Sequence, residues 1–208
     1  MTDLIALNAA QVESESDPFT ETRYKQFARW ISPTARDLLD VGCNTGRGGL
    51  ALKAALPGLA IVGLDLVEAR LDRLPRAAYS RAICGSAAAI PCADDAFDAV
   101  VAGEFIEHLR PLDAMAFFHE AFRVLRIGGV LALTTPNPSD IKRRLRGKSV
   151  LGGSHVSQHH QEALVLQFQM AGFGSVSVRG TGKVSWYLGT RFPLKWLYGS
   201  FLVAGRKY

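Results

Sequence analysis

The chain has 208 residues, of which 48% are hydrophobic and 21% are charged, and its formal net charge is +5 at pH 7. This composition predicts a single folded domain over residues 1–208 and excludes a disordered or fibrous protein. The N-terminus lacks the basic segment and long apolar core of a signal peptide, and no apolar run reaches the roughly 20 residues that span a bilayer. We therefore expect a cytoplasmic protein, and leave open its oligomeric state and peripheral contact with a membrane surface.

The cysteines, Cys43, Cys84 and Cys92, are odd in number and show no metal-ligand spacing. Without an export signal, they predict free thiols in a reducing compartment and no bound metal. The positive net charge favours anionic partners only weakly. No segment resembles a nucleic-acid-reading helix or a zinc finger, so we expect no nucleic-acid partner.

Apolar runs alternate with helical stretches along the chain, which predicts an α/β fold. Through the first five runs this alternation indicates a doubly wound, mostly parallel sheet with helices on both faces. The last two runs have no obvious long helix between them, which favours a seven-stranded sheet with an antiparallel final strand. The predicted helices are residues 19–31, 48–55, 68–74, 111–125 and 158–170, and the predicted strands are residues 37–41, 60–64, 82–84, 99–102, 130–134, 175–178 and 201–204.

Three parts follow from this order of elements. Residues 1–35 are expected to form an N-terminal helical cap, residues 36–135 a cofactor-binding core, and residues 136–208 a substrate-side segment with the final strands. The polar stretch 136–157 follows the carboxyl end of the fifth strand, where open α/β sheets bind ligands.

A glycine turn directly after the first strand predicts a nucleotide-binding loop. Gly42, Gly46 and Gly48 let the backbone turn sharply and approach a ligand, and the loop leads free N–H groups into a helix start. Asn44 stands at the central position, and asparagine tolerates a positive φ better than other non-glycine residues. The glycine spacing also matches the dinucleotide loop of short-chain dehydrogenases, so an NAD-dependent enzyme stays open.

Asp65 ends the second strand about 20 residues after this loop. A carboxylate there can accept both ribose hydroxyls of an adenosine, although an N-cap role for the next helix is the alternative. A carboxylate at this position fits S-adenosylmethionine or NAD equally. It disfavours NADP, because it would repel the 2′-phosphate.

Three segments carry a resemblance to a known family. Residues 39–46 look like the first motif of class I S-adenosylmethionine (SAM)-dependent methyltransferases, residues 85–109 resemble the middle motifs of small members, and residues 123–133 resemble the helix, glycine turn and fifth strand that close the core. The resemblance covers roughly residues 36–138 and is to small single-domain, type 11-like methyltransferases. It implies a Rossmann-like fold, SAM as cofactor and methyl transfer.

The resemblance also implies roles for individual residues. Ser86 stands where an acidic residue usually holds the adenine amino group, while Gly103 and Glu104 fall where the methionine half is contacted. The pair Arg23 and Tyr24 resembles one that lies over the cofactor, although a solvated arginine beside a core tyrosine is equally consistent. The candidate cofactor residues are Arg23, Tyr24, Asp40, Gly42, Asn44, Gly46, Asp65, Leu66, Ser86, Ala87, Gly103 and Glu104.

Transfer to a hydroxyl requires a base, and histidines are the candidates. His155, His159 and His160 cluster between the fifth strand and the next helix. The alternative to a catalytic role is a structural one, with His160 near the N-cap of that helix. His108 resembles the histidine that opens the helix after the fourth strand, and either capping or catalysis fits it. We take His155 and His108 as the candidate catalytic residues.

Two stretches bear on the acceptor. The basic run 142–148 indicates either an anion-steering or membrane-contacting surface, or a solvated helix face docked by Ile141 and Leu145. The aromatic residues of 186–198 indicate a substrate wall or packed edge, with a dimer interface or lipid-facing patch as alternatives.

These observations favour a SAM-dependent methyltransferase that acts on a small-molecule or glycan acceptor. An acceptor that carries an anionic group is consistent with them. The expected acceptor group is the hydroxyl of a sugar, glycan precursor or secondary metabolite. One alternative is an NAD-dependent oxidoreductase, although the chain lacks the Tyr-x-x-x-Lys pair of short-chain dehydrogenases. The other is a SAM-binding, non-catalytic regulatory protein, because Asn44 and Ser86 depart from the family pattern.

Overall fold

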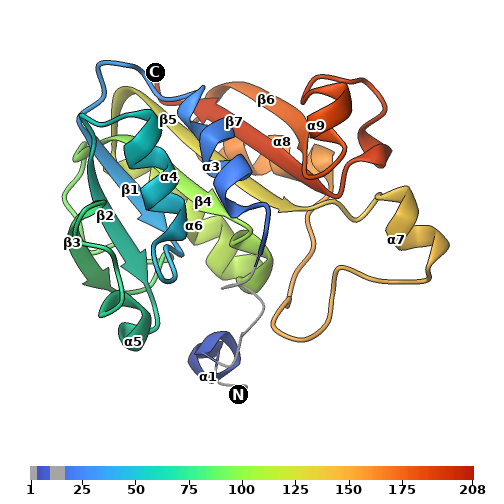
Figure 1. Cartoon of the computed structure of the whole chain (residues 1–208), viewed down its shortest axis with the longest axis horizontal. Helices are drawn as coiled ribbons and strands as arrows, with labels where there is room; N and C mark the ends of the chain where they lie inside the picture. The colour runs from blue at the N-terminus through green and yellow to red at the C-terminus, as the bar shows by residue number, and fades with distance from the viewer. Residues whose placement is uncertain (1–3, 10–16) are drawn as a thin grey trace.

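The computed structural model describes residues 4–9 and 17–208. Within them, seven strands form one sheet in the order β3-β2-β1-β4-β5-β7-β6 (Figure 1). The strands are β1 (Asp37–Val41), β2 (Ala60–Asp65), β3 (Tyr79–Cys84), β4 (Phe97–Gly103), β5 (Leu125–Pro136), β6 (Gly174–Thr181) and β7 (Ser200–Arg206). The first five pair in parallel, whereas β7 runs antiparallel to both β5 and β6. The predicted mostly parallel α/β sheet with a reversed final strand is confirmed.

All five predicted helices are present, and short ones join them. The helices are α1 (Leu4–Ala9), α3 (Thr20–Ala28), α4 (Arg47–Ala55), α5 (Glu68–Leu71), α6 (Pro111–Val124), α7 (Ile141–Leu145), α8 (Gln161–Met170) and α9 (Ser185–Leu188), with 3₁₀ turns η1 (Ile106–His108) and η2 (Lys195–Leu197). No helix of the described ranges combines the length and the apolar character needed to cross a bilayer. All three cysteines lie in these ranges as free thiols.

Helices cover both faces of the sheet (Figure 1). One face packs against α3, α4 and α5 through a cluster that includes Phe27 and Leu52. The other packs against α6 and α8 through Phe117 and Phe168. Central strands such as β4 are apolar on both sides, as burial on two faces requires, and Val100 is fully buried.

Two boundaries differ from the sequence prediction. Strand β5 begins at Leu125 rather than residue 130, because Leu125 already pairs with Phe97 and the register shift before Ala99 absorbs the glycine turn. His108 lies in η1 and does not open α6, which begins three residues later with Pro111 at its first position.

The segment between β5 and α8 forms α7 and a long loop that lie beside the sheet (Figure 1). Asp140 caps α7 by accepting a hydrogen bond from the Lys142 N–H at 3.0 Å. The expected docking of this helix by Leu145 is wrong, since 80% of that side chain is exposed. The basic side chains of α7 therefore stand on a solvated helix without a buried face.

Candidate active site

A cavity of about 1100 Å³ opens where β2, β1 and β4 end, next to the point at which the strand order reverses. Open α/β sheets bind their ligands at this crevice. Its wall comes from distant parts of the chain: α1, the start of α3, the glycine loop, the ends of β2 and β4, and the loop before α8. The volume is enough for a nucleotide-sized ligand.

Most of the predicted site residues line this cavity. Those that do are Arg23, Tyr24, Gly42, Asn44, Asp65, Leu66, Ala87, Gly103, Glu104, His108 and His155. Three predicted cofactor residues, Asp40, Gly46 and Ser86, are not in its wall. The Ser86 side chain is exposed and its hydroxyl accepts a hydrogen bond from the Ala88 N–H at 3.2 Å, so it caps its own turn.

The glycine loop has the backbone that its sequence requires. Gly42 and Asn44 both lie in the left-handed region, with φ values of 68° and 51°, so asparagine does hold the turn. A Cβ on Gly42 would meet the Phe105 ring at 2.4 Å, which explains the need for glycine there. Gly46 (φ 83°) is the N-cap residue of α4 and packs against Pro75 and Tyr79, on the side away from the cavity.

Asp65 ties the loop to the end of β2. Its Oδ2 accepts the Asn44 N–H at 3.0 Å and its Oδ1 accepts the Val67 N–H at 2.9 Å, while Arg70 Nη1 lies 3.7 Å from Oδ1. Because a carboxylate has about four acceptor positions, lone pairs remain for a ligand in the cavity. The turn-forming and ligand-facing interpretations of this residue are therefore compatible.

Asp40 lies beneath the loop, fully buried. Tyr24 donates to its Oδ1 at 2.7 Å and Tyr79 donates to its Oδ2 at 2.5 Å, so the carboxyl joins α3 and β3 to β1. Burial raises the pKa of Asp40 from 3.8 to about 7, although both tyrosine hydrogen bonds act against it. Asp40 therefore stabilises the glycine loop from below and does not line the cavity.

A pair of opposite charges faces the cavity at the end of β4. Arg23 Nη2 pairs with Asp17 at 2.9 Å, and its Nε lies 3.7 Å from Glu104 Oε1. Both the Nε and this Oε1 are buried and have no hydrogen-bond partner among residues 4–9 and 17–208. Glu104 has a φ of 51° and is fixed by its N–H, which donates to the Thr134 carbonyl oxygen at 3.0 Å. Unsatisfied buried polar atoms of this kind favour a polar ligand.

His108 and His155 meet at the cavity wall. Their rings stack edge to face with centroids 4.8 Å apart. Burial, with a smaller effect from His155, lowers the pKa of His108 from 6.5 to about 4, so its imidazole is neutral at pH 7. The two other histidines of the predicted cluster lie elsewhere: His159 is buried against the Ser157 hydroxyl and Ile106 carbonyl oxygen, and His160 is the N-cap residue of α8.

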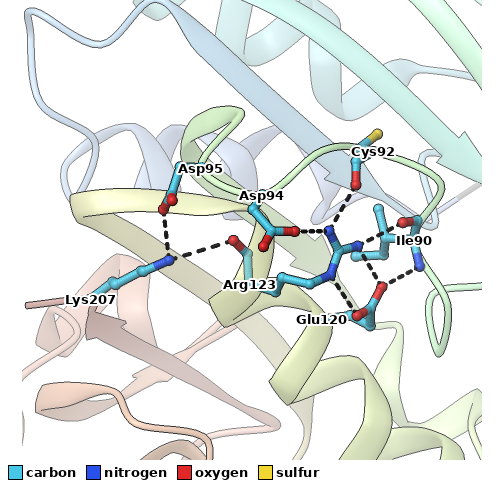
Figure 2. A network of polar contacts seen from close by, with 7 residues as sticks. All are labelled: Ile90, Cys92, Asp94, Asp95, Glu120, Arg123 and Lys207. Carbon is cyan, nitrogen blue, oxygen red and sulfur yellow. Dashed lines mark hydrogen bonds and ion pairs between the residues drawn. The ribbon is translucent and has the colours of Figure 1, made fainter.

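The loop between β3 and β4, which carries Ala87, is held by one guanidinium. Figure 2 shows Arg123 donating to the carbonyl oxygens of Ile90 and Cys92, each at 2.8 Å. The same side chain donates to the carboxylates of Glu120 and Asp94. Glu120 in turn accepts the Ile90 N–H at 2.7 Å, so α6 fixes both polar groups of that backbone position.

Several cavity residues had no recognisable signal in the sequence. Asn8 reaches the cavity from α1, and its carbonyl oxygen accepts from Arg70. Ser154 and Ser200 also line the wall, from the loop before α8 and the start of β7. Only the folding of the chain brings these distant positions together. Arg70 could have been predicted from the sequence, because it is a basic residue five positions after Asp65.

Residues 39–133 match a family model described as a methyltransferase domain. A protein of Mycolicibacterium smegmatis, named a probable S-adenosylmethionine-dependent methyltransferase, is 40% identical over 104 residues, which are 49% of this chain and 38% of that protein. Residues 39–133 are therefore similar to class I SAM-dependent methyltransferases. The resemblance of the glycine loop and the middle motifs is thereby confirmed, and the family's cofactor is SAM.

The names of other relatives of this chain specify different acceptors. The malonyl-[acyl-carrier protein] O-methyltransferase of Methylococcus capsulatus is 31% identical over 134 residues, which are 62% of this chain and 48% of that protein. The demethylmenaquinone methyltransferase of Roseiflexus castenholzii is 34% identical over 103 residues, which are 48% and 42% of the two chains. The chain thus spans less than half the length of these curated relatives.

A solved structure shares the fold over nearly the whole chain. A SAM-dependent methyltransferase of Thermotoga maritima superposes with a TM-score of 0.73 at 16% identity, covering 99% of this chain and 100% of that chain. At this identity the likeness shows the fold alone.

Proposed function

We propose that this chain transfers a methyl group from SAM to the hydroxyl of a small-molecule acceptor, such as a sugar, a glycan precursor or a secondary metabolite. The observation that carries the proposal is the order of groups along one cavity. Asp65 ends β2, the glycine loop follows the adjacent β1, and Glu104 with Arg23 stands at the next strand, β4. His108 follows β4 in η1, and His155, from the loop between α7 and α8, lies against it.

The residues present fit SAM. The remaining lone pairs of Asp65 suit the two ribose hydroxyls. The unsatisfied Arg23 Nε and Glu104 Oε1 suit the carboxylate and the ammonium of an amino-acid end, because their charges are opposite to those groups. Bound SAM would supply a methyl group on a sulfonium, from which the neutral thioether of S-adenosylhomocysteine is a good leaving group.

The work left to the protein is alignment and exclusion of water. His108 and His155 face the cavity as the polar side chains that orient and activate the acceptor hydroxyl. The neutral state of His108 at pH 7 suits such a role, since a neutral imidazole retains a lone pair. We assign positioning of the methionine half to Arg23 and Glu104.

An anionic group on the acceptor suits the surroundings. A second cavity, of about 260 Å³, shares Arg23 with the first and is also lined by Lys142, Arg143 and Lys183. Three cationic side chains beside the site raise the local concentration of anions. The run 142–148 then serves as a steering surface for a phosphate or carboxylate of the acceptor.

The two alternatives have little support. The match of residues 39–133 to a methyltransferase domain and the missing Tyr-x-x-x-Lys pair speak against an NAD-dependent oxidoreductase. The regulatory alternative rested on Asn44 and Ser86. Asn44 adopts the left-handed turn, and Ser86 lies outside the cavity wall, so neither departure disables the site.

The test is transfer of a radiolabelled methyl group from SAM to a panel of sugars, sugar phosphates and phenols. We expect labelled product with at least one acceptor, and a rate at least roughly tenfold lower in His155→Ala, because positioned acid–base groups contribute this much or more. SAM affinity should be unchanged in that variant. His160→Ala is the matched control, since His160 is exposed outside the cavity. Full activity of His155→Ala, or loss of SAM binding in the folded variant, would contradict the assignment.

A further inference from the structure

The last part of the chain carries a large excess of positive charge. Residues 136–208 contain eleven lysines and arginines but only two acidic residues, Asp140 and Glu162, so their formal net charge is +9. The whole chain has a net charge of +5, which leaves −4 for residues 1–135. Such a charge asymmetry between two parts of a chain indicates an anionic partner, such as a membrane or a nucleic acid.

Most of this charge lies on one surface, formed by α7, α9, η2 and the turns beside them. Figure 1 shows α7 and α9 at the same end of the molecule. Helix α7 contacts η2, and both line the second cavity together with the turn before α9. The cations of this α7–α9–η2 surface are Lys142, Arg143, Arg144, Arg146, Lys148, Lys183, Arg191 and Lys195. Within residues 4–9 and 17–208, none of them pairs with a carboxylate.

The α7–α9–η2 surface also exposes large apolar side chains. Leu145 is 80% exposed and Tyr187 is 77% exposed. Exposed apolar side chains of the same surface are also Trp186, Leu188, Leu194 and Trp196. Helices α7 and η2 have no buried residue, and α9 buries only Ser185. Apolar side chains that gather in this way mark an interaction site.

The cations lie near enough to one another to interact unfavourably. Burial and the charge of Arg179 lower the pKa of Lys195. Burial, followed by the charges of Arg191 and Arg29, lowers the pKa of Arg179 itself. Because these like charges repel, an anionic surface placed against them is stabilising.

An anionic bilayer matches this combination of side chains better than a nucleic acid does. Lysine and arginine attract anionic headgroups, while tryptophan and tyrosine favour the interface between headgroups and acyl chains. On α7, Ile141 and Leu145 are spaced four residues apart and share one face, and the three residues between them are cations. A nucleic acid would use the cations and the aromatic rings, but it offers nothing that rewards the exposed leucines.

We propose that the α7–α9–η2 surface docks on a bilayer that contains anionic lipids. The docked bilayer would lie close to the main cavity, because Phe19 lines both cavities and its ring centroid is 5.3 Å from that of Trp186. Leu145 and Tyr187 would enter the interface, and the cations would contact the headgroups. This binding does not depend on the proposed methyl transfer.

Co-sedimentation of the whole chain with vesicles tests the role of the charges. We expect binding to phosphatidylcholine vesicles that contain about 30% phosphatidylglycerol, weak binding to phosphatidylcholine alone, and release in about 0.5 M NaCl. Replacing Arg144, Arg146 and Lys148 together by glutamine should weaken binding at least roughly tenfold, because each cation near an anionic surface contributes. These three residues lie outside both cavities.

The matched control replaces Arg36, Arg76 and Arg81 together by glutamine. All three are exposed and precede residue 136, so the same charge is removed away from the α7–α9–η2 surface. We expect vesicle binding within about twofold of the unmodified chain, because the removed charges lie beyond the reach of unscreened attraction.

A second pair of variants tests the apolar contribution. Leu145→Ser combined with Tyr187→Ser should weaken vesicle binding at least roughly fivefold, since binding at an interface scales with the apolar area that is inserted. Leu112→Ser combined with Ile127→Ser is the control, because these side chains are 78% and 79% exposed elsewhere on the molecule. An unchanged midpoint of thermal unfolding shows that each variant is folded.

Several outcomes would overturn the proposal. They are absent binding to the anionic vesicles, or surface variants that bind as their controls do. Tighter binding to a single-stranded RNA oligonucleotide than to vesicles would assign the surface to nucleic acid. Displacement by inorganic phosphate, but not by NaCl of equal ionic strength, would assign it to a free anion. Vesicle binding together with absent methyl transfer supports the docking surface and counts against the proposed function alone.

Discussion

Asp40 illustrates how a carboxyl group in a ligand-binding motif serves as a support. It lies under the glycine loop, closed off from water, with one tyrosine hydroxyl on each oxygen. The hydrogen bonds from Tyr24 and Tyr79 join three elements at one point, and Tyr24 also packs closely against Gly48 and Gly103. The residue therefore acts on the cofactor site through the loop that it carries.

The raised pKa of Asp40 makes stability depend on pH. Its pKa is about 7 in the folded chain and near 3.8 when unfolded, so between these values the folded state holds a proton that the unfolded state has lost. The stabilisation is full below the unfolded pKa and is lost as pH rises through about 7. From pH 5 to pH 8 we expect the free energy of unfolding to fall by about 2–3 kcal/mol more in the native chain than in Asp40→Asn.

Urea unfolding of both proteins at the two pH values measures this difference. The asparagine variant is a suitable comparison, because it keeps the volume and the capacity for hydrogen bonds with the two tyrosines while removing the titrating group. Parallel pH profiles for the two proteins would show that Asp40 is ionised in the folded chain throughout.

The sequence predicted the location of some single residues relative to the cavity and not of others. Asn44 adopts the expected left-handed turn and Asp65 lies at the cavity, because the demands of a turn and of a strand end are local. Ser86 and Asp40 lie outside the cavity wall, since whether a side chain faces the cavity depends on neighbours such as Tyr79 that are distant in the chain. The pairing of His108 with His155 likewise required the fold.

At the level of elements, the loop between β3 and β4 depends on a helix that follows it in the chain. Arg123, near the end of α6, satisfies two backbone carbonyl oxygens of the loop and two carboxylates (Figure 2). Lys207 adds a contact from its Nζ to Asp95 at 2.8 Å. The loop begins at Gly85 and Ala87 in the cavity wall, so its support bears on ligand binding.

Arg123→Gln should destabilise the chain by about 1–2 kcal/mol, because several charge-assisted hydrogen bonds are lost and solvent screens a side chain that is 31% exposed. We also expect weaker SAM binding, as the loop loses its anchor. Thermal unfolding and calorimetry with SAM measure the two effects. Arg144→Gln, on the exposed α7, is the control for loss of a positive charge. A variant indistinguishable from this control would show that the loop holds its conformation without Arg123.

The seven strands were predictable because buried parallel strands are short, apolar and separated by turn residues, as in residues 99–102. The early start of β5 was not, since a glycine turn signals a break and only pairing with Phe97 shows that the strand continues across it. Short helices such as α7 and α9 have too few residues for a periodic pattern. Their positions depend on tertiary contacts.

For the whole molecule, the parallel half of the sheet and its antiparallel end have different roles. The carboxyl ends of β1, β2 and β4 form the floor of the cavity, whereas the segments from α7 to β7 supply Ser200, His155 and the basic rim. The family pattern covers the first half, which is why the cofactor was predictable. The proposed acceptor side lies in the second half, and the names of the relatives specify different acceptors.

The central claim is that the cavity binds SAM, and calorimetric titration tests it most directly. We expect the intact chain to bind one SAM or one S-adenosylhomocysteine and to show no saturable binding of NAD. Asp65→Ala should weaken SAM binding by roughly tenfold to a hundredfold, the effect of losing hydrogen bonds to a charged group. Saturable binding of NAD without binding of SAM would contradict the account, and undiminished SAM affinity in Asp65→Ala would remove Asp65 from the cofactor site.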